Sequence, residues 1–258
     1  LYGMAENYLE MPEVALVTEM ARRGLFGDPY YAHGSYLHDC KSLHHRADGS
    51  PTWRAAGQVG RRGATYPTHS AGPAMRFLIA VHPDERIAGV TARGTGPRTD
   101  PEHPHDDTTV VLLDTTGGRL VEIRIDMMSN RPHRTGFALQ GTTGAYESDP
   151  FGGEGRICLA ENPPPGPHRE IAKWWRPISE FAEHVPARHL RYAAEIAASG
   201  HGGADFLTVR NWTEACLGEA EILVGWPEAR EWSAVAWLSE ESLLTGRRIA
   251  MTGPSALS

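Results

Sequence analysis

The chain has 258 residues, 40% of them hydrophobic and 22% charged, so it is long enough to bury a substantial core and is neither disordered nor fibrous. Its formal net charge of -7 gives no basic footprint for nucleic acid, and no apolar run approaches the roughly 20 residues that cross a bilayer. Three scattered cysteines without CxxC spacing support neither a disulfide framework nor a thiolate zinc site. We therefore expect a cytoplasmic protein that has neither nucleic acid nor a membrane as its partner.

The first elements along the chain are a helix and a strand. The start, LYGMAENYLEM, has no initiator methionine at position 1 and resembles the middle of a domain, so we expect a fragment of a longer chain. Apolar residues at helical spacing predict a helix over residues 11–23, closed by Gly24. After Asp28-Pro29, alternating residues over 30–39 predict a strand that places Tyr36 and His38 on the same face.

A proline-rich turn precedes the second predicted helix. Residues 40–65 lack a clear period and are interpreted as a long functional loop. The stretch GATYPTHSAGP then predicts a helix start with Ser70 as N-cap, which puts Tyr66 and His69 just outside the helix. Two interpretations remain open: these side chains face a cleft beside the positive end of the helix dipole, or they are ordinary packing and surface residues.

The second half predicts a sheet followed by helices. Strands are expected over 87–95, 108–114, 119–128 and 135–141, with a glycine hairpin turn at 115–118. Residues 149–169, which contain NPPPGPH, are predicted to form an extended surface loop, and helices are expected over 187–198, 204–216 and 227–244. This order predicts an α+β domain built on a meandering antiparallel sheet.

Two histidine-rich clusters invite comparison with metal sites. The first contains His38, Asp39, His44 and His45, and we favour a polar substrate pocket over a metal there. The second, in DPEHPHDD, contains His103, His105, Asp106 and Asp107 between prolines, and we interpret it as a solvated loop. We assign no metal to either cluster.

Several motifs occur together in an order that resembles one protein superfamily. They are Ala5-Glu6-Asn7, ARRGLFGDPYYAHGSYLHD, Trp53-Arg54, YPTHSAGP, Gly141-Thr142-Thr143-Gly144, and His201-Gly202-Gly203 with Asp205-Phe206. This set resembles the C-terminal part of the glucose-fructose oxidoreductase/inositol dehydrogenase superfamily, and within it the NAD-dependent glycosidases of the α-N-acetylgalactosaminidase type. The resemblance runs from residue 4 to about 245.

The resemblance implies an architecture and a chemistry. It implies an open, mainly antiparallel sheet with helices on one face, a free sheet face that packs against another subunit, and a missing N-terminal dinucleotide-binding domain. No Gly-x-Gly-x-x-Gly follows a strand here, so residues 1–258 are expected to form a single substrate and oligomerisation domain. In the similar glycosidases NAD oxidises the sugar C3 hydroxyl, a base removes the C2 proton, the C1 substituent leaves, water adds and the hydride returns.

The resemblance also assigns candidate site residues. Tyr36, Tyr66 and His69 are implied to be catalytic, with Tyr66 and His69 also beside the nicotinamide of NAD or NADP. The implied substrate-binding residues are Glu6, Arg54, Tyr146, Asp149 and His201. Tyr146 comes early for the family's substrate-facing tyrosine, and Asp149 stands near its expected place.

Three functions remain open at this point. The chain is expected to belong to an NAD(P)-dependent enzyme acting on a small-molecule sugar, either a glycosidase with transient oxidation or a sugar dehydrogenase with net redox change. The third alternative is a sugar-binding or dimerisation module without catalysis. The isolated domain is expected to be inactive in each case.

Overall fold

The computed structural model describes residues 1–160 and 174–251, so the predicted NPPPGPH loop lies outside the described residues. The chain divides into two compact units, each built from three segments. Unit 1 comprises residues 1–32, 72–84 and 136–230, and unit 2 comprises residues 33–71, 85–135 and 231–258.

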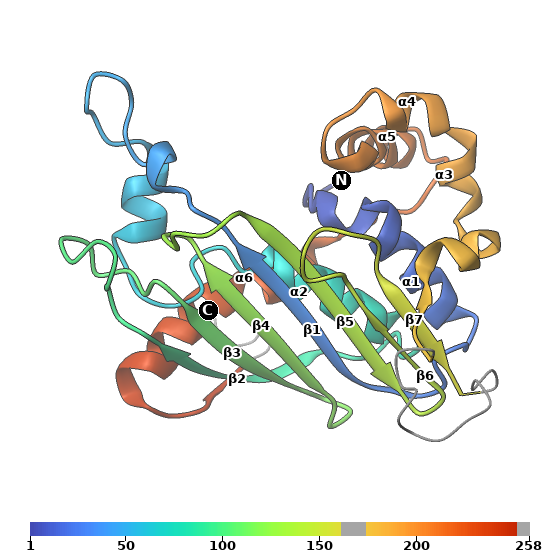
Figure 1. Cartoon of the computed structure of the whole chain (residues 1–258), viewed down its shortest axis with the longest axis horizontal. Coiled ribbons are helices and arrows are strands. Elements are labelled where there is room, and N and C mark those ends of the chain that lie inside the picture. Colours follow the sequence, from blue (N-terminus) through green and yellow to red (C-terminus); the bar gives the residue numbers. More distant parts are fainter. Residues whose placement is uncertain (161–173, 252–258) are drawn as a thin grey trace. The chain divides into compact units, whose positions relative to one another are not determined.

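Helices and a sheet make up the described chain, as Figure 1 shows. The helices are α1 (Pro12–Arg22), α2 (Thr68–Ile79), α3 (Ala187–Arg191), α4 (Ala193–Ala197), α5 (Ala204–Cys216) and α6 (Trp226–Thr245). The strands are β1 (Pro29–Leu37), β2 (Ile87–Gly94), β3 (Thr109–Thr115), β4 (Leu120–Asp126), β5 (Arg134–Gly141), β6 (Gly144–Glu147), β7 (Arg156–Leu159), β8 (Arg176–Pro177) and β9 (Ile249–Ala250). None of the described helices is long and apolar enough to cross a membrane.

The strands form a nine-stranded sheet in the order β8-β7-β6-β5-β1-β4-β3-β2-β9. Every pair whose register is known is antiparallel. The predicted α+β class with an open, mainly antiparallel sheet is thus confirmed. The sheet is not a simple meander, however, because the early strand β1 separates β4 from β5.

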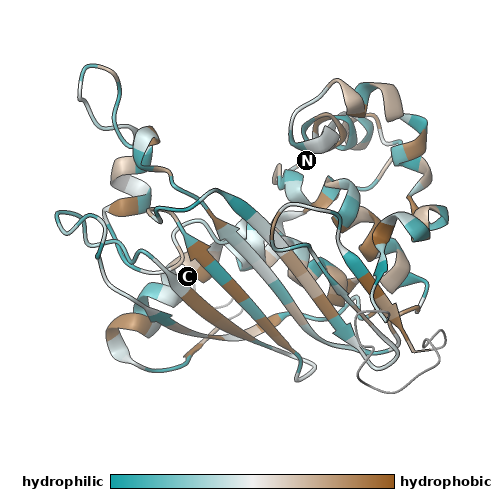
Figure 2. Cartoon of the chain, in the orientation of Figure 1, coloured by the Kyte–Doolittle hydropathy of each residue, from teal (hydrophilic) through white to brown (hydrophobic). Residues whose placement is uncertain are grey.

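The β3–β4 hairpin of unit 2 follows the predicted alternation. Val121, Ile123 and Ile125 are at most 1% exposed, whereas Glu122 and Arg124 between them are partly exposed. Figure 2 shows the same alternation as brown and teal bands along β4. One face of the hairpin therefore contributes to the core, as a period of two requires.

Helix α6 fixes neighbouring backbone within unit 2 through polar side chains. The hydroxyl of Ser242 accepts the N–H of Ala92 in β2 at 2.9 Å, and that of Ser239 accepts the N–H of Ala64 at 2.9 Å. Trp232, on the same helix, is completely buried. These contacts hold the chain just before the Tyr66 turn against a packed core.

The segments Leu25-Phe26-Gly27-Asp28 and Gly141-Thr142-Thr143-Gly144, both of which belong to motifs quoted from the sequence, contact each other within unit 1. The N–H of Thr143 donates to the carbonyl of Phe26 at 3.1 Å, and the N–H of Asp28 donates to the hydroxyl of Thr142 at 2.9 Å. A side chain on Gly141 would strike the Phe26 carbonyl. The Gly-rich sequences therefore serve close backbone packing between the end of α1 and the β5–β6 turn.

Helix α2 begins earlier than predicted. The carbonyl of Pro67 accepts from the N–H groups of Ser70 and Ala71, so the first turn closes around Thr68 and His69 lies inside the helix. Pro73 consequently sits inside the helix instead of in its first turn. Because proline lacks an N–H, the helix loses one bond to the carbonyl of residue 69.

Two other predictions also need correction. The helix expected over 187–198 is broken at Tyr192, whose φ of -109° and ψ of 28° are not helical, so it forms α3 and α4. Part of the predicted loop 149–169 is strand β7, whose four residues pair with β6. A strand of only four residues carries little periodicity in the sequence.

Strand β1 passes unusually close to the start of α2 in unit 2. A Cβ atom built on Gly34 would collide with the carbonyl oxygen of Ser70. Only glycine lets the two backbones approach so closely, and this approach sets Tyr36 near the first turn of α2.

We predict that Gly34→Ala destabilises the protein by about 1–3 kcal/mol, because the added methyl group overpacks the β1–α2 contact. Gly57→Ala is the matched control, since its Cβ would meet only the Trp53 ring at 3.9 Å. Urea denaturation of both variants measures the difference. Equal stability of the two would contradict the close contact.

Candidate active site

Three of the predicted catalytic side chains gather in unit 2. Tyr36 comes from β1, Tyr66 from the turn before α2, and His69 from the first turn of that helix. The ring centroids of Tyr36 lie 5.3 Å from Tyr66 and 5.5 Å from His69, and Tyr66 and His69 make an edge contact at 4.8 Å. A phenol and an imidazole within this range provide groups for proton transfer on one small ligand.

Arg54 borders the same cluster. Its guanidinium carbon lies 4.6 Å from the Trp53 ring centroid and 5.8 Å from that of Tyr66. A π-helical turn, Ala55–Val59, follows it directly, and such turns are frequent at functional sites. The Nη1 atom of Arg54 is buried and has no hydrogen-bond partner among the described residues. The cluster thus contains a fixed cation with a free donor.

Two histidines extend the cluster beyond the residues that the sequence assigned to it. The ring of His38 stacks on Tyr36 with centroids 3.7 Å apart and planes 12° apart, and His133 stacks on His38 at 5.4 Å and 20°. In the sequence, the alternation of the strand predicts that the side chains of His38 and Tyr36 lie on the same face. His133 precedes β5, and no local pattern connects it to β1.

The ionisable groups around His38 are ones that carry a positive charge when protonated. Burial, together with the charges of His133, His69 and Arg54, lowers the pKa of His38 from 6.5 to about 4. The imidazole of His38 is therefore neutral at physiological pH. Its protonation is disfavoured because it would add one more positive charge to the same cluster.

A second group of predicted residues lies in unit 1. Glu6 is buried and its carboxylate caps the N–H of Tyr8 at 3.3 Å. Next to it, Asn7 Nδ2 donates to Asp205 Oδ1 at 2.6 Å, and His201 Nδ1 lies 2.8 Å from Asp205 Oδ2. Asn7 and Asp205 occur in the motifs Ala5-Glu6-Asn7 and Asp205-Phe206, but no local pattern predicts that they contact each other.

The His201–Asp205 pair has features of an oriented base. The hydrogen bond from His201 holds the pKa of Asp205 below its usual range, and Asn7 adds to the effect. His201 is exposed and has a φ of 51°, the only positive value among the non-glycine residues of the described chain. Because the carboxylate of Asp205 engages Nδ1 of His201, Nε2 remains available to another group. Strained backbone of this kind is concentrated at functional sites.

Two other predicted substrate residues lie elsewhere in unit 1. Tyr146 is completely buried, its hydroxyl lies 2.9 Å from Ser148 Oγ, and its ring packs edge-on against Phe77. Tyr146 follows the glycine turn 141–144, as the sequence indicated, but its side chain faces the core. It therefore has no exposed surface that a substrate could contact. The carboxylate of Asp149 accepts the N–H groups of Phe151 and Gly153 at 2.7 and 3.0 Å, which closes a local turn.

The interpretation of DPEHPHDD as a solvated loop holds for residues 100–104, which are exposed or half-exposed, but is wrong for His105 and Asp106. His105 is 2% exposed and Asp106 is completely buried. Asp106 accepts hydrogen bonds from Arg62 Nη2 and from the N–H of Gly96, both at 2.7 Å, so it serves as a structural anchor. Across residues 1–160 and 174–251, no group of three or more His, Cys, Asp or Glu side chains converges as metal ligands.

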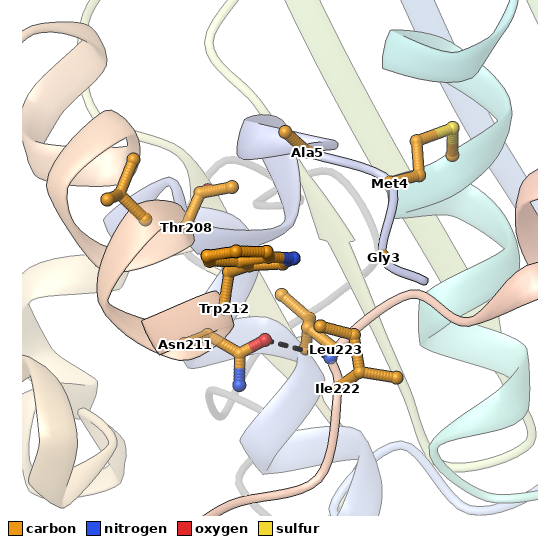
Figure 3. A pocket seen from close by; sticks show the side chains of 9 residues that line it. Gly3, Met4, Ala5, Thr208, Asn211, Trp212, Ile222 and Leu223 are labelled. Atoms are coloured by element: carbon orange, nitrogen blue, oxygen red, sulfur yellow. Dashed lines mark hydrogen bonds between the residues drawn. The ribbon is translucent and has the colours of Figure 1, made fainter. Parts of the chain in front are cut away.

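A separate apolar cavity of about 270 Å³ occurs in unit 1 and is drawn in Figure 3. Its walls are residues 3–5, part of α5 and the chain at 222–223, with the indole of Trp212 across one side. The amide of Asn211 is engaged by the N–H of Leu223 and the carbonyl of Glu221. No titratable side chain lines this cavity, which therefore lacks groups for acid–base chemistry.

Solved structures share the fold of this chain. An NAD binding oxidoreductase from Klebsiella pneumoniae matches with a TM-score of 0.71 and 15% identity over 96% of this chain and 65% of that one. A levoglucosan dehydrogenase matches with a TM-score of 0.70 and 16% identity over 98% of this chain and 67% of that one. This likeness shows that the chain shares its fold with a large part of each of these two proteins.

The sequence places the chain in one family among the proteins that share this fold. The model of the glycosyl hydrolase 109 C-terminal domain matches residues 11–252, and the chain belongs to this family. An alpha-N-acetylgalactosaminidase of Shewanella oneidensis is 28% identical over 265 residues, which are 93% of this chain and 55% of that protein. A glycosyl hydrolase family 109 protein of Saccharopolyspora erythraea is 28% identical over 88% of this chain and 50% of that protein. The chain spans about half the length of these relatives.

We predict that the imidazole signals of His38 titrate with a midpoint near pH 4 in an NMR pH series. His133→Ala should move that midpoint upward, because it removes a neighbouring positive charge. His45→Ala is the control and should leave it unchanged, since His45 is exposed and is not among the groups that shift the pKa of His38. A midpoint near 6.5 in the unmodified protein would contradict the burial of His38.

Proposed function

We propose that this chain is the substrate domain of an NAD- or NADP-dependent enzyme that hydrolyses glycosides through transient oxidation at C3 and elimination. The observation that carries the proposal is the gathering of Tyr36, Tyr66 and His69 beside Arg54 in unit 2. Membership of the glycosyl hydrolase 109 family supports it, as does the name alpha-N-acetylgalactosaminidase given to a relative 28% identical to this chain.

The cofactor is proposed to be held mainly by a preceding domain, since a dinucleotide-binding glycine motif is missing from the sequence. Tyr66 and His69 are half-buried rings in edge contact, and they fit one side of a nicotinamide. The solved levoglucosan dehydrogenase contains NADH and levoglucosan, which supports a nicotinamide and a sugar for proteins of this fold. The bound cofactor would supply reversible hydride transfer at the sugar.

The remaining steps of the cycle are proton transfers and binding. We assign proton transfer at the reacting carbons to His69 and Tyr36, because an imidazole and a phenol can move protons near neutral pH when positioned. Arg54 would donate to a sugar oxygen through its free Nη1. Glu6 is assigned to substrate binding because of the resemblance. Its carboxylate is buried, so little of it is accessible to solvent.

In unit 1, we propose that His201 acts as a general acid or base and is not only a binding residue. Asp205 fixes its tautomer through Nδ1, and Asn7 holds the second oxygen of Asp205. This arrangement is one in which a carboxylate orients an imidazole and stabilises its protonated form.

A sugar dehydrogenase is the alternative within the same fold class, and the likeness to levoglucosan dehydrogenase favours it. Net redox change separates the two. The glycosidase should release p-nitrophenol from p-nitrophenyl α-N-acetylgalactosaminide without accumulation of NADH when the natural full-length protein is assayed. Accumulation of NADH with free sugar, and no glycoside cleavage, would favour the dehydrogenase.

The non-catalytic alternative concerns sugar binding or self-association. We also propose that the protein forms a homo-oligomer through the free sheet face and that it works in the cytoplasm. Size-exclusion chromatography of this chain, with and without candidate sugars, tests the association. A monomer that binds no sugar would argue against a binding or dimerisation module.

We predict that Tyr36→Phe or His69→Ala in the full-length enzyme lowers turnover at least about 100-fold, as loss of a general acid or base does. Thermal unfolding should stay close to that of the parent protein, which separates chemistry from folding. Tyr30→Phe is a matched control, since Tyr30 lies on the same strand but is half exposed. Near-normal rates for both site variants would remove these residues from the mechanism.

We predict that Asp205→Asn lowers turnover by about 10- to 1000-fold, because a neutral amide no longer stabilises a protonated His201. Turnover, and not only KM, should change in the same variant. The rate profile with pH and the KM are both measured. If only KM changes, His201 is a binding residue and not an acid or base.

A further inference from the structure

Trp53 is an exposed indole at the border of the unit 2 ring cluster, with 64% of its surface accessible. The guanidinium carbon of Arg54 lies 4.6 Å from the Trp53 ring centroid and 5.8 Å from that of Tyr66, so one cation contacts both rings. The Tyr66 ring in turn lies 5.3 Å from that of Tyr36, which is 8% exposed. The cluster therefore runs through adjacent contacts from a buried phenol to an exposed indole.

The backbone on both sides of Trp53 is fixed by hydrogen bonds. The N–H of Thr52 donates to the carbonyl of His44 at 2.8 Å, and its hydroxyl donates to the carbonyl of Leu43 at 2.7 Å. The N–H of Arg54 donates to the same hydroxyl at 3.2 Å. Because an indole has only two side-chain torsions, a tryptophan on such backbone loses little conformational entropy when a ligand covers it.

The protein itself covers only part of this indole. Arg54 lies over one face of the ring, and a Cβ atom built on Gly57 would lie 3.9 Å from Cε3 of Trp53. The remaining ring surface is already open to solvent, so a ligand reaches it without displacing any side chain. Single exposed apolar side chains are common on proteins. Trp53 differs from them because it shares its guanidinium partner with a tyrosine of the candidate site.

The chemistry of the indole favours a ring as its ligand. The indole offers flat apolar surface, and its only polar hydrogen is on Nε1. The C–H face of a sugar ring, or an aryl ring, covers such a surface well, whereas a methyl group covers little of it. In the proposed reaction the C1 substituent of the substrate departs and needs a path to solvent. Trp53 stands at the exposed end of the cluster, where such a substituent would lie.

We propose that Trp53 is a specificity-determining residue that binds the ring of the leaving group, so that the enzyme prefers glycosides whose C1 substituent is a ring with an apolar face. The inference rests on the proposed function, since it takes the substrate to be a glycoside. The reacting sugar lies toward Tyr36 and His69, and the leaving ring lies against Trp53. Trp53 moves no proton, and its contribution is to binding.

Matched pairs of substrates separate the leaving group from the sugar. Methyl and p-nitrophenyl α-glycosides of N-acetylgalactosamine, galactose and glucose are assayed with the full-length parent protein and with Trp53→Ala. We expect Trp53→Ala to lower kcat/KM about 3- to 10-fold for the p-nitrophenyl member, mainly through KM, and to leave the methyl member within about twofold. Trp53→Tyr, which keeps an aromatic ring, should stay within about twofold of the parent on both members.

A disaccharide with the same reacting sugar identifies the kind of ring. A loss for the disaccharide as well as for the p-nitrophenyl glycoside shows that a second sugar is accepted, and a loss for the p-nitrophenyl glycoside alone restricts the subsite to aryl groups. Both results support the inference. A loss of equal size for the methyl and p-nitrophenyl members overturns it, because a disturbed Arg54 and not a missing ring contact gives that pattern.

Trp237→Ala is the matched control. Trp237 is 65% exposed and also lies beneath a guanidinium group, that of Arg61 at 3.7 Å, but it comes from α6. This variant should leave both members of each pair unchanged. The inference is overturned if Trp237→Ala reproduces the loss of Trp53→Ala, or if Trp53→Ala cleaves the p-nitrophenyl glycosides as the parent does.

Isothermal titration with the same pairs separates this inference from the proposed function. If the parent cleaves no glycoside, the glycosidase function fails, and titration still shows whether the p-nitrophenyl member binds more tightly than the methyl member and loses that advantage in Trp53→Ala. Equal binding of the two members by a parent that cleaves glycosides overturns the inference and leaves the function standing. A parent that binds neither member of any pair overturns both.

Discussion

The close approach of two backbones at Gly34 and Ser70 is the constraint on which the unit 2 cluster depends. Because β1 presses against the first turn of α2, side chains a short distance along each element are forced together. Tyr36 lies two residues beyond Gly34 and His69 one residue before Ser70, so both project from packed elements. Groups held on strands and helices keep their geometry better than groups on loops, so the Tyr36 and His69 rings are held 5.5 Å apart by packed backbone.

The two imidazole environments of the candidate residues differ in character. His38 is surrounded by cationic groups and half-buried, which favours its neutral form. His201, in unit 1, is exposed, and its Nδ1 lies 2.8 Å from the carboxylate of Asp205. One imidazole is therefore enclosed by rings and a guanidinium group, and the other is oriented by a carboxylate at the surface.

Local periodicity was enough to predict most elements of the fold but not their tertiary relations. Alternation located the β3–β4 hairpin, and helical spacing located α1, α5 and α6. The start of α2 was missed because Pro67, outside the apolar pattern, accepts the first hydrogen bonds. Burial of Asp106 was missed because its partner Arg62 lies 44 residues earlier, and a charged residue between prolines is locally indistinguishable from a solvated one. The site was predictable where a motif or a strand face carried it, as for Tyr36 and His38, and was not predictable for His133.

The burial of Tyr146 changes where sugar recognition has to be sought. A tyrosine whose ring lies in the core and whose hydroxyl is engaged by Ser148 cannot select among sugars without disrupting the packing around it. Asp149, which the sequence offered in its place, already accepts two backbone N–H groups. Selectivity gained by hydrogen bonding requires polar atoms that are left unpaired by the protein itself, since a sugar lacking the matching hydroxyl group then leaves them buried and unsatisfied. In unit 2, Arg54 Nη1 and His38 Nδ1 are buried atoms without a hydrogen-bond partner among the described residues, so the chemical requirement for such selectivity is met there and not at Tyr146.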